Sequence, residues 1–111
     1  MGATPRAAFA GSSLYSAAKA AANMFVQYAA SEGASQSTRV NAVAPGIVST
    51  NIMGGAMSSE AIEGFAAGAQ LVGRAGQSTE IANVVTLLAS EDGSFMTGTI
   101  VTADGGWSLK A

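Results

Sequence analysis

The residues best suited to chemistry are Tyr15 and Lys19, which stand four positions apart in the segment Tyr-Ser-Ala-Ala-Lys. On a helix this spacing puts a phenol and an ammonium on the same face. A free phenol has a pKa near ~10, and a nearby cation together with the positive end of a helix favours the phenolate. Such a pair can give a proton to an oxygen forming on a carbonyl, or take one from an alcohol as hydride leaves. On the spacing alone, a helix start at Tyr15 with a solvated Lys19 is the simpler interpretation.

Composition narrows the chemistry further. The chain has 111 residues, 49% of them apolar and 11% charged, with a net charge of −2 and neither cysteine nor histidine. Disulfides, thiolate nucleophiles, Ser-His-Asp triads and imidazole ligands are therefore excluded, and we expect no metal site. The charge argues against a nucleic-acid partner. The longest uncharged stretch, 40–59, contains Pro45 and three glycines and is no membrane span, so we expect a cytoplasmic chain.

Hydrophobic periodicity and turn residues predict alternating helices and strands. The expected elements are helices over 15–32, 60–69 and 79–90 and strands over 37–44 and 99–103, with Gly33 as a left-handed helix cap and Ser78 as an N-cap. Strands joined by a helical crossover normally lie parallel. We therefore expect an α/β fold, the carboxyl-terminal portion of a Rossmann-like doubly wound parallel sheet with about two strands and three helices.

Several motifs stand in an order and at separations that resemble one family, the short-chain dehydrogenases/reductases, over essentially the whole chain. The matching segments are the YxxxK helix at 15–21, the strand ending Asn-x-Val-x-Pro-Gly at 41–46, its PGxVxT continuation to Thr50, the GRxGxPEEIA run at 73–82 with Ser78 in place of proline, and the TGxxxxxDGG ending at 97–106. Short motifs are weak singly, but five in register are specific.

The resemblance implies a role for each matching residue. Tyr15 is implied to be the catalytic acid/base, and Lys19 to bind the nicotinamide ribose hydroxyls and favour the phenolate. Pro45 and Gly46 are implied to turn the chain beneath the nicotinamide of NAD or NADP, which the sequence does not distinguish. The backbone of Val48 is implied to meet the carboxamide, and the Thr50 hydroxyl the carboxamide or a phosphate. A turn at a strand's carboxyl end is also where open α/β sheets bind ligands.

Residues 51–70 fall where the family has its variable substrate lid. Met53, Met57, Ile62 and Phe65 would offer the lid an adaptable apolar surface, and plain packing is an equally good interpretation for each of them. We expect the turn 104–106 to be structural rather than catalytic, and we expect Asn41 to satisfy buried backbone groups.

The resemblance also implies what would surround these residues. No glycine-rich dinucleotide loop precedes Tyr15, and the family's active-site serine would fall at Gly2 or next to Met1, while Ser12 and Ser13 are too close to the tyrosine. We therefore expect residues 1–111 to be the catalytic and substrate-binding part of one Rossmann-fold domain whose glycine-rich half is absent. Two parallel strands make a poor sheet alone, so we expect a molten, oligomeric or aggregating isolated chain.

The implied activity is that of an NAD(P)(H)-dependent oxidoreductase that interconverts a ketone and a secondary alcohol, weak or inactive as an isolated chain. Its partners would be a small carbonyl or alcohol substrate and, in full-length form, further copies in a dimer or tetramer. The alternative is a non-enzymatic remnant or oligomerisation fragment of a reductase. The many alanines of helix 15–32 allow close approach, so we expect a tight contact with another helix under either interpretation.

Overall fold

The computed structural model describes residues 10–52 and 54–110. The helices and strands are, in order, α1 (Ser13–Gly33), β1 (Ala42–Pro45), α2 (Ser59–Ala69), α3 (Ser78–Ala89) and β2 (Ile100–Ala103), with short 3-10 turns at Ala34–Gln36, Glu91–Gly93 and Trp107–Leu109. β1 and β2 pair in parallel, with Ala42 opposite Ile100 and Pro45 opposite Ala103. The expected α/β class, with two parallel strands and three helices, is confirmed.

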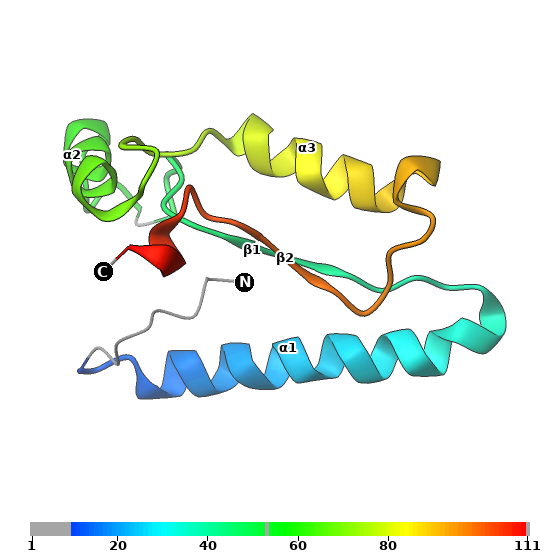
Figure 1. The fold of residues 1–111 in the computed structure, drawn as a ribbon. Helices are drawn as coiled ribbons and strands as arrows, with labels where there is room; N and C mark the ends of the chain where they lie inside the picture. The colour runs from blue at the N-terminus through cyan, green and yellow to red at the C-terminus, as the bar shows by residue number, and fades with distance from the viewer. Residues whose placement is uncertain (1–9, 53, 111) are drawn as a thin grey trace.

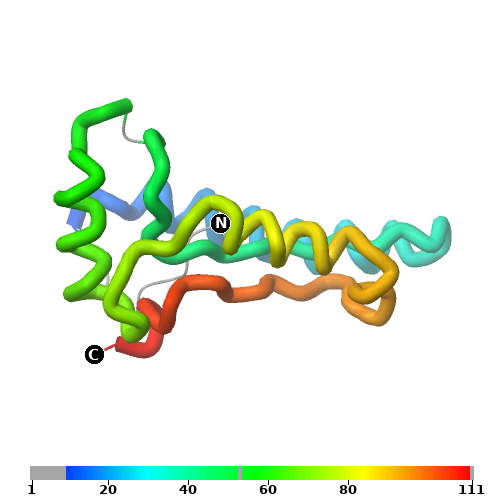
Figure 2. The backbone as a smooth tube through the Cα atoms, turned by 90° about the horizontal axis from the view of Figure 1, so that it is seen from above, coloured from blue at the N-terminus to red at the C-terminus, as the bar shows by residue number. Residues whose placement is uncertain are grey.

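The two strands lie between α1 on one face and α3 on the other (Figure 1). The view from above agrees, since α3 crosses over the strands while α1 runs behind them (Figure 2). α2 lies beyond the carboxyl ends of the strands, near the red 3-10 turn at Trp107–Leu109. Because parallel strands end at the same edge, the segments that leave β1 and β2 meet beside α2.

A buried cluster fastens α2 to this edge of the sheet. Ile62 and Ala66 of α2 pack with Ala75 of the following loop, and Ile47, just after β1, packs against them. Burial of such apolar side chains stabilises by about 25 cal/mol per Å² removed from water. The cluster therefore holds the segment after β1 against α2.

The start of β1 lies later than expected. Residues 37–41 are not strand, and the pairing begins at Ala42. The Arg39 guanidinium instead donates to the carbonyl oxygens of Leu88 at 2.7 Å, Met96 at 3.1 Å and Ser90 at 3.2 Å, where a cation also suits the negative end of α3. The sequence predicts a strand here because the composition is typical of extended chain, but the Thr38 amide bonds the Gly33 carbonyl and the Val40 amide bonds the Thr97 hydroxyl in place of a strand partner.

Asn41 satisfies backbone groups, as expected. Its Nδ2 donates to the Met96 carbonyl at 2.8 Å, and its Oδ1 accepts from the Thr99 amide at 3.2 Å. One amide side chain thus bridges the two ends of the turn that leads into β2.

The predicted left-handed cap at Gly33 is wrong. Gly33 ends α1 with a right-handed φ of −74°, and the left-handed residue is Ser37, with φ of 55°, after the 3-10 turn Ala34–Gln36. The reason for a glycine here is space, because a Cβ would lie 3.2 Å from the Cβ of Thr38. The Thr38 amide returns to the Gly33 carbonyl at 3.0 Å, so the chain folds back directly over the glycine.

α1 leaves large side chains in contact with solvent. Five are more than half exposed, namely Leu14, Tyr15, Met24, Phe25 and Tyr28, and within the described part of the chain only Val26 and Ala30 of this helix are buried. Neither α2 nor α3 runs beside α1 (Figures 1 and 2). The expected tight contact of its alanine face with another helix is therefore not made within the described residues.

We expect the isolated chain to form oligomers whose mass rises with concentration, because contiguous exposed apolar side chains drive association. Phe25→Gln should lower the average mass, since Phe25 lies among the exposed side chains of α1. Phe95→Gln, at a still more exposed phenylalanine outside the helices, should leave it unchanged. Light scattering after size exclusion measures the mass, and a monomer at every concentration would contradict the expectation.

Candidate active site

One pocket lies at the carboxyl edge of the strands and has a volume of about 480 Å³. It is lined by all six residues predicted to bind cofactor, which are Tyr15, Lys19, Pro45, Gly46, Val48 and Thr50. The first two come from α1 and the others from β1 and the segment after it. The sequence prediction thus named residues that the fold brings to one place from segments about thirty residues apart.

Tyr15 and Lys19 face each other on the first turns of α1. The Lys19 Nζ lies 5.5 Å from the centroid of the Tyr15 ring, within the range of a cation–π interaction. Tyr15 is 59% exposed, so its phenol can meet a ligand in the pocket and exchange protons with water. The arrangement offers one O–H group with a fixed positive charge beside it.

The chain turns sharply at Gly46. A Cβ there would lie 2.6 Å from the Asp104 carbonyl oxygen and would also collide with Gln70, so only glycine fits. The Gly46 amide continues the parallel ladder by donating to the Ala103 carbonyl at 3.1 Å. Two further backbone bonds of 2.9 Å, Ser49 to Gly76 and Gly76 to Ile47, then hold the segment after the turn. The backbone after β1 is therefore bonded both to β2 and to the segment before α3.

Asp104 organises the turn that follows β2. Its carboxylate accepts from the amides of Gly106 at 2.9 Å and Ser108 at 2.8 Å. Burial alone would raise the pKa of Asp104, but the hydrogen bonds from Ser108 and Gly106 outweigh it and leave the pKa below its ordinary value. These hydrogen bonds hold the turn together, and Trp107, which follows it, lies in the pocket wall.

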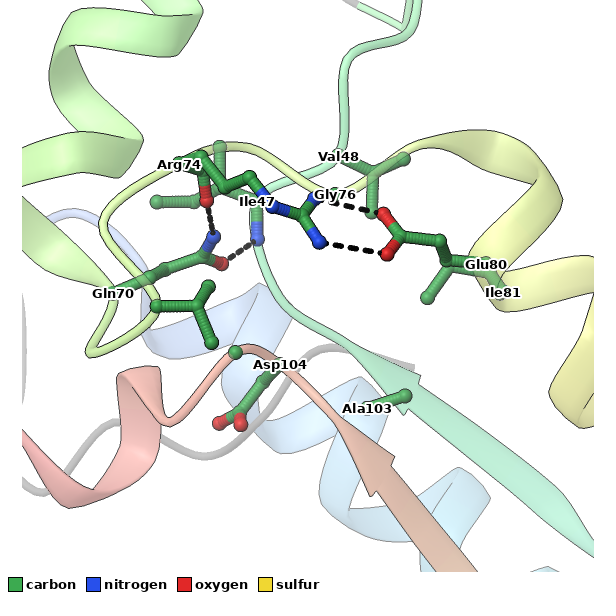
Figure 3. Close-up of a pocket in the computed structure, with 11 residues that line it drawn as sticks. Ile47, Val48, Gln70, Arg74, Gly76, Glu80, Ile81, Ala103 and Asp104 are labelled. Carbon is green, nitrogen blue, oxygen red and sulfur yellow. Dashed lines mark hydrogen bonds and ion pairs between the residues drawn. The ribbon is translucent and has the colours of Figure 1, made fainter.

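Arg74 and Glu80 form a two-pronged ion pair at the start of α3, with N–O distances of 2.8 and 2.9 Å (Figure 3). The Glu80 carboxylate also accepts from the Gln77 amide at 2.8 Å. These hydrogen bonds, that from Arg74 first, lower the pKa of Glu80 to about 2. The predicted N-cap at Ser78 is wrong, because Glu80 reaches back to the Gln77 amide, which makes Gln77 the cap and Ser78 the first helical residue.

The three predicted lid residues that the structure describes do not gather in this pocket. Met57 and Phe65 are exposed. Ile62 is 8% exposed and belongs to the buried cluster with Ala66, which agrees with the packing interpretation of Ile62. Met53 lies outside the described residues. None of the three described lid residues lines the pocket that contains Tyr15.

Sequence reasoning missed the other residues in the pocket wall, which are Ile52, Ser78, Ile81 and Trp107. A signal existed for Ile81, the first member of an apolar stripe on α3. A signal also existed for Trp107, which directly follows the glycines of the turn after β2. It missed Gln70 as well, which is 2% exposed and hydrogen-bonds Ile47 across 23 positions. No local pattern reports such a pairing.

Across 10–52 and 54–110 no helix has both the length and the apolar character needed to cross a membrane. Over the same residues no three acidic side chains come together as metal ligands.

The fold and the pocket define an α/β protein with a pocket at the carboxyl ends of parallel strands, the place where nucleotide-binding sheets hold their ligands. The family described as Enoyl-(Acyl carrier protein) reductase matches residues 3–108. A short chain dehydrogenase family protein of Francisella tularensis superimposes with a TM-score of 0.80 at 27% identity, covering 95% of this chain and 47% of its own. The chain belongs to the short-chain dehydrogenase/reductase family.

Curated relatives are oxidoreductases. The chain is 40% identical over 101 residues to the 3-oxoacyl-[acyl-carrier-protein] reductase FabG of Pseudomonas aeruginosa, covering 91% of this chain and 40% of that protein. It is 38% identical over 96 residues to the acetoacetyl-CoA reductase of Shinella zoogloeoides, covering 86% and 39%. The chain therefore spans about two fifths of the length of these relatives.

The ion pair of Glu80 predicts a loss of stability in acid. Because the folded pKa of Glu80, about 2, is below its ordinary 4.5, the stabilisation is complete above pH 4.5 and is lost as the pH falls toward 2. Glu80→Gln should therefore lower the thermal midpoint near neutral pH and have little effect near pH 2. Glu32→Gln, at an exposed glutamate of α1, is the matched control. Equal effects of Glu80→Gln at both pH values, at one protein concentration, would contradict the assignment.

Proposed function

We propose that the chain carries the acid/base and nicotinamide-binding part of an NAD(P)(H)-dependent oxidoreductase that interconverts a ketone and a secondary alcohol. The observation that carries the proposal is the pocket of about 480 Å³ in which Tyr15 and Lys19 face the turn at Gly46. It is supported by membership of an oxidoreductase family and by two relatives named for the reduction of 3-oxoacyl compounds.

The residues of the pocket suit a nicotinamide. Gln70 and Asp104 fill the place that a Cβ of Gly46 would take, so only glycine can follow this backbone path along the pocket. The backbone of Val48 and the hydroxyl of Thr50 would hold the carboxamide, and Lys19 would hold the ribose hydroxyls. Nothing in these groups prefers NAD over NADP. When bound, the cofactor supplies or accepts the hydride.

Tyr15 would then move the proton. In reduction the phenol of Tyr15 would give its proton to the carbonyl oxygen as hydride reaches the carbonyl carbon. The ketone then becomes an alcohol and Tyr15 a phenolate. The ammonium of Lys19, 5.5 Å from the centroid of the ring, would be the positive charge beside that group. Water restores the proton, because Tyr15 is more than half exposed. In the alcohol-to-ketone direction the same groups act in reverse.

A 3-oxoacyl thioester is the first substrate to test, since both relatives are named for this class. The exposed apolar side chains of Met57, before α2, and Phe65, on α2, lie outside the pocket that contains Tyr15, so they would meet only a part of the acyl chain that extends beyond it. The exposed side chains of α1 would pack against a second copy in a homo-oligomer.

The test compares Tyr15→Phe with Tyr28→Phe, which removes the same oxygen from an exposed tyrosine of α1 outside the pocket. Calorimetric titration with NADH and NADPH should give saturable binding to both variants. Reduction of acetoacetyl-CoA, followed by nicotinamide absorbance, should fall at least about 100-fold in Tyr15→Phe and stay unchanged in Tyr28→Phe. Equal activity of the two variants would refute the role of Tyr15.

Calorimetry also separates the main proposal from its alternative. Absence of any heat of binding with NADH and NADPH would favour the non-enzymatic fragment, whose α1 serves only in association. In that case Phe25→Gln should still lower the oligomer mass, because association does not need the pocket.

A further inference from the structure

Gln70 is a buried polar residue at a junction of three segments. It is 2% exposed and has the largest fully buried side chain in the described part of the chain. It directly follows α2, and its backbone is fixed by bonds from its amide to the Ala66 carbonyl at 2.9 Å and from the Gly73 amide to its carbonyl at 3.1 Å. The side chain therefore projects from a rigid base.

Both ends of the Gln70 side chain are bonded to backbone (Figure 3). The Oε1 accepts from the Ile47 amide at 2.6 Å, and the Nε2 donates to the Arg74 carbonyl at 2.6 Å. An amide N–H only donates and a carbonyl only accepts, so the partners leave one orientation of the side-chain amide. Buried bonds of this kind are costly to lose, because water cannot replace the partner.

The backbone at Gly46 and Gly105 lies directly against the Gln70 side chain. A Cβ at Gly46 would collide with the Gln70 Oε1, and a Cβ at Gly105 would lie 3.4 Å from its Nε2. Two glycines, one after each strand, thus flank the same amide. Gln70 lies behind the turn, in a small cavity of about 180 Å³ that it shares with Ile47 and Val48. Tyr15 and Lys19 do not line that cavity.

We propose that Gln70 is a positioning residue for the cofactor loop, which we define as residues 45–48. By holding the Ile47 amide from behind, it sets the backbone path between Gly46 and Val48 and so the shape of the pocket wall that meets the nicotinamide. It also ties that wall to α2, within the region where the family has its substrate lid. The cofactor part of this inference rests on the proposed function.

The test uses three variants of the 111-residue chain. Gln70→Met keeps the volume and removes both hydrogen bonds. Gln70→Glu keeps an acceptor for the Ile47 amide and removes the donor to Arg74. Gln27→Met makes the same change as the first variant at an exposed position of α1 and is the control.

Amide hydrogen exchange at Ile47, relative to amides of α3, is the first measurement because it needs no cofactor. We expect it to rise roughly tenfold in Gln70→Met, the cost of one lost buried hydrogen bond, and to stay near wild type in Gln70→Glu and Gln27→Met. The second measurement is the dissociation constant for NADH and NADPH, which should rise several-fold in Gln70→Met and less in Gln70→Glu. If Gln70→Met speeds exchange at all amides, its effect at Ile47 is not specific. The exchange rate at Ile47 in Gln70→Glu, which keeps the acceptor, then decides whether the bond to the Ile47 amide holds the loop.

Unchanged exchange at Ile47 in Gln70→Met would overturn the inference, and equal increases in Gln70→Met and Gln70→Glu would show that packing alone is involved. Faster exchange with unchanged cofactor affinity would refute the link to the cofactor. If the wild type and Gln27→Met bind neither cofactor, the proposed function fails with that link, and exchange at Ile47 alone then decides whether Gln70 holds the loop.

Discussion

The close approach of the chain at Gly46 to the backbone of Asp104 is the contact on which the site depends. Two parallel strands end at the same edge of a sheet, so the segments that follow them begin side by side. Here the Gly46 amide still bonds the Ala103 carbonyl, and a Cβ at Gly46 would lie 2.6 Å from the Asp104 oxygen. The two exits therefore run against each other, which brings Val48 and Trp107 to one pocket.

The sequence predicts well those elements of this chain that depend on residues close together in the sequence. The helices expected over 60–69 and 79–90 lie within a residue or so of α2 and α3, because an apolar stripe and a turn at each end are local signals. The six residues predicted to bind cofactor also line one pocket, since each occupies a fixed place in a motif and the fold gathers those places at one edge. The parallel pairing followed from the helical crossover between the strands.

What failed depends on residues far away in the sequence. Residues 37–41 have the composition of a strand, but Arg39 bonds carbonyls about fifty positions on. Gly33 is the exception, because the residue that crowds it, Thr38, is only five positions on. Gln70 looks like an ordinary polar residue after a helix, and only the tertiary structure puts it against Ile47. At Arg39 and Gln70 long-range packing overrides a local preference, which one sequence cannot report.

The two sides of the pocket, the cofactor loop and α1, are fixed to the rest of the structure by different numbers of contacts. The cofactor loop is bonded to β2, to Gly76 and to Gln70, so its position is overdetermined. α1 is anchored through Val26 and Ala30, its only buried residues in the described part of the chain. Tyr15 stands fifteen positions from Ala30, or about 22 Å along the helix at 1.5 Å per residue. A small tilt of α1 about that anchor therefore moves the phenol much more than it moves Ala30. Changes in the packing of α1, including those caused by a second copy on its exposed face, would alter the distance between Tyr15 and a loop that stays in place.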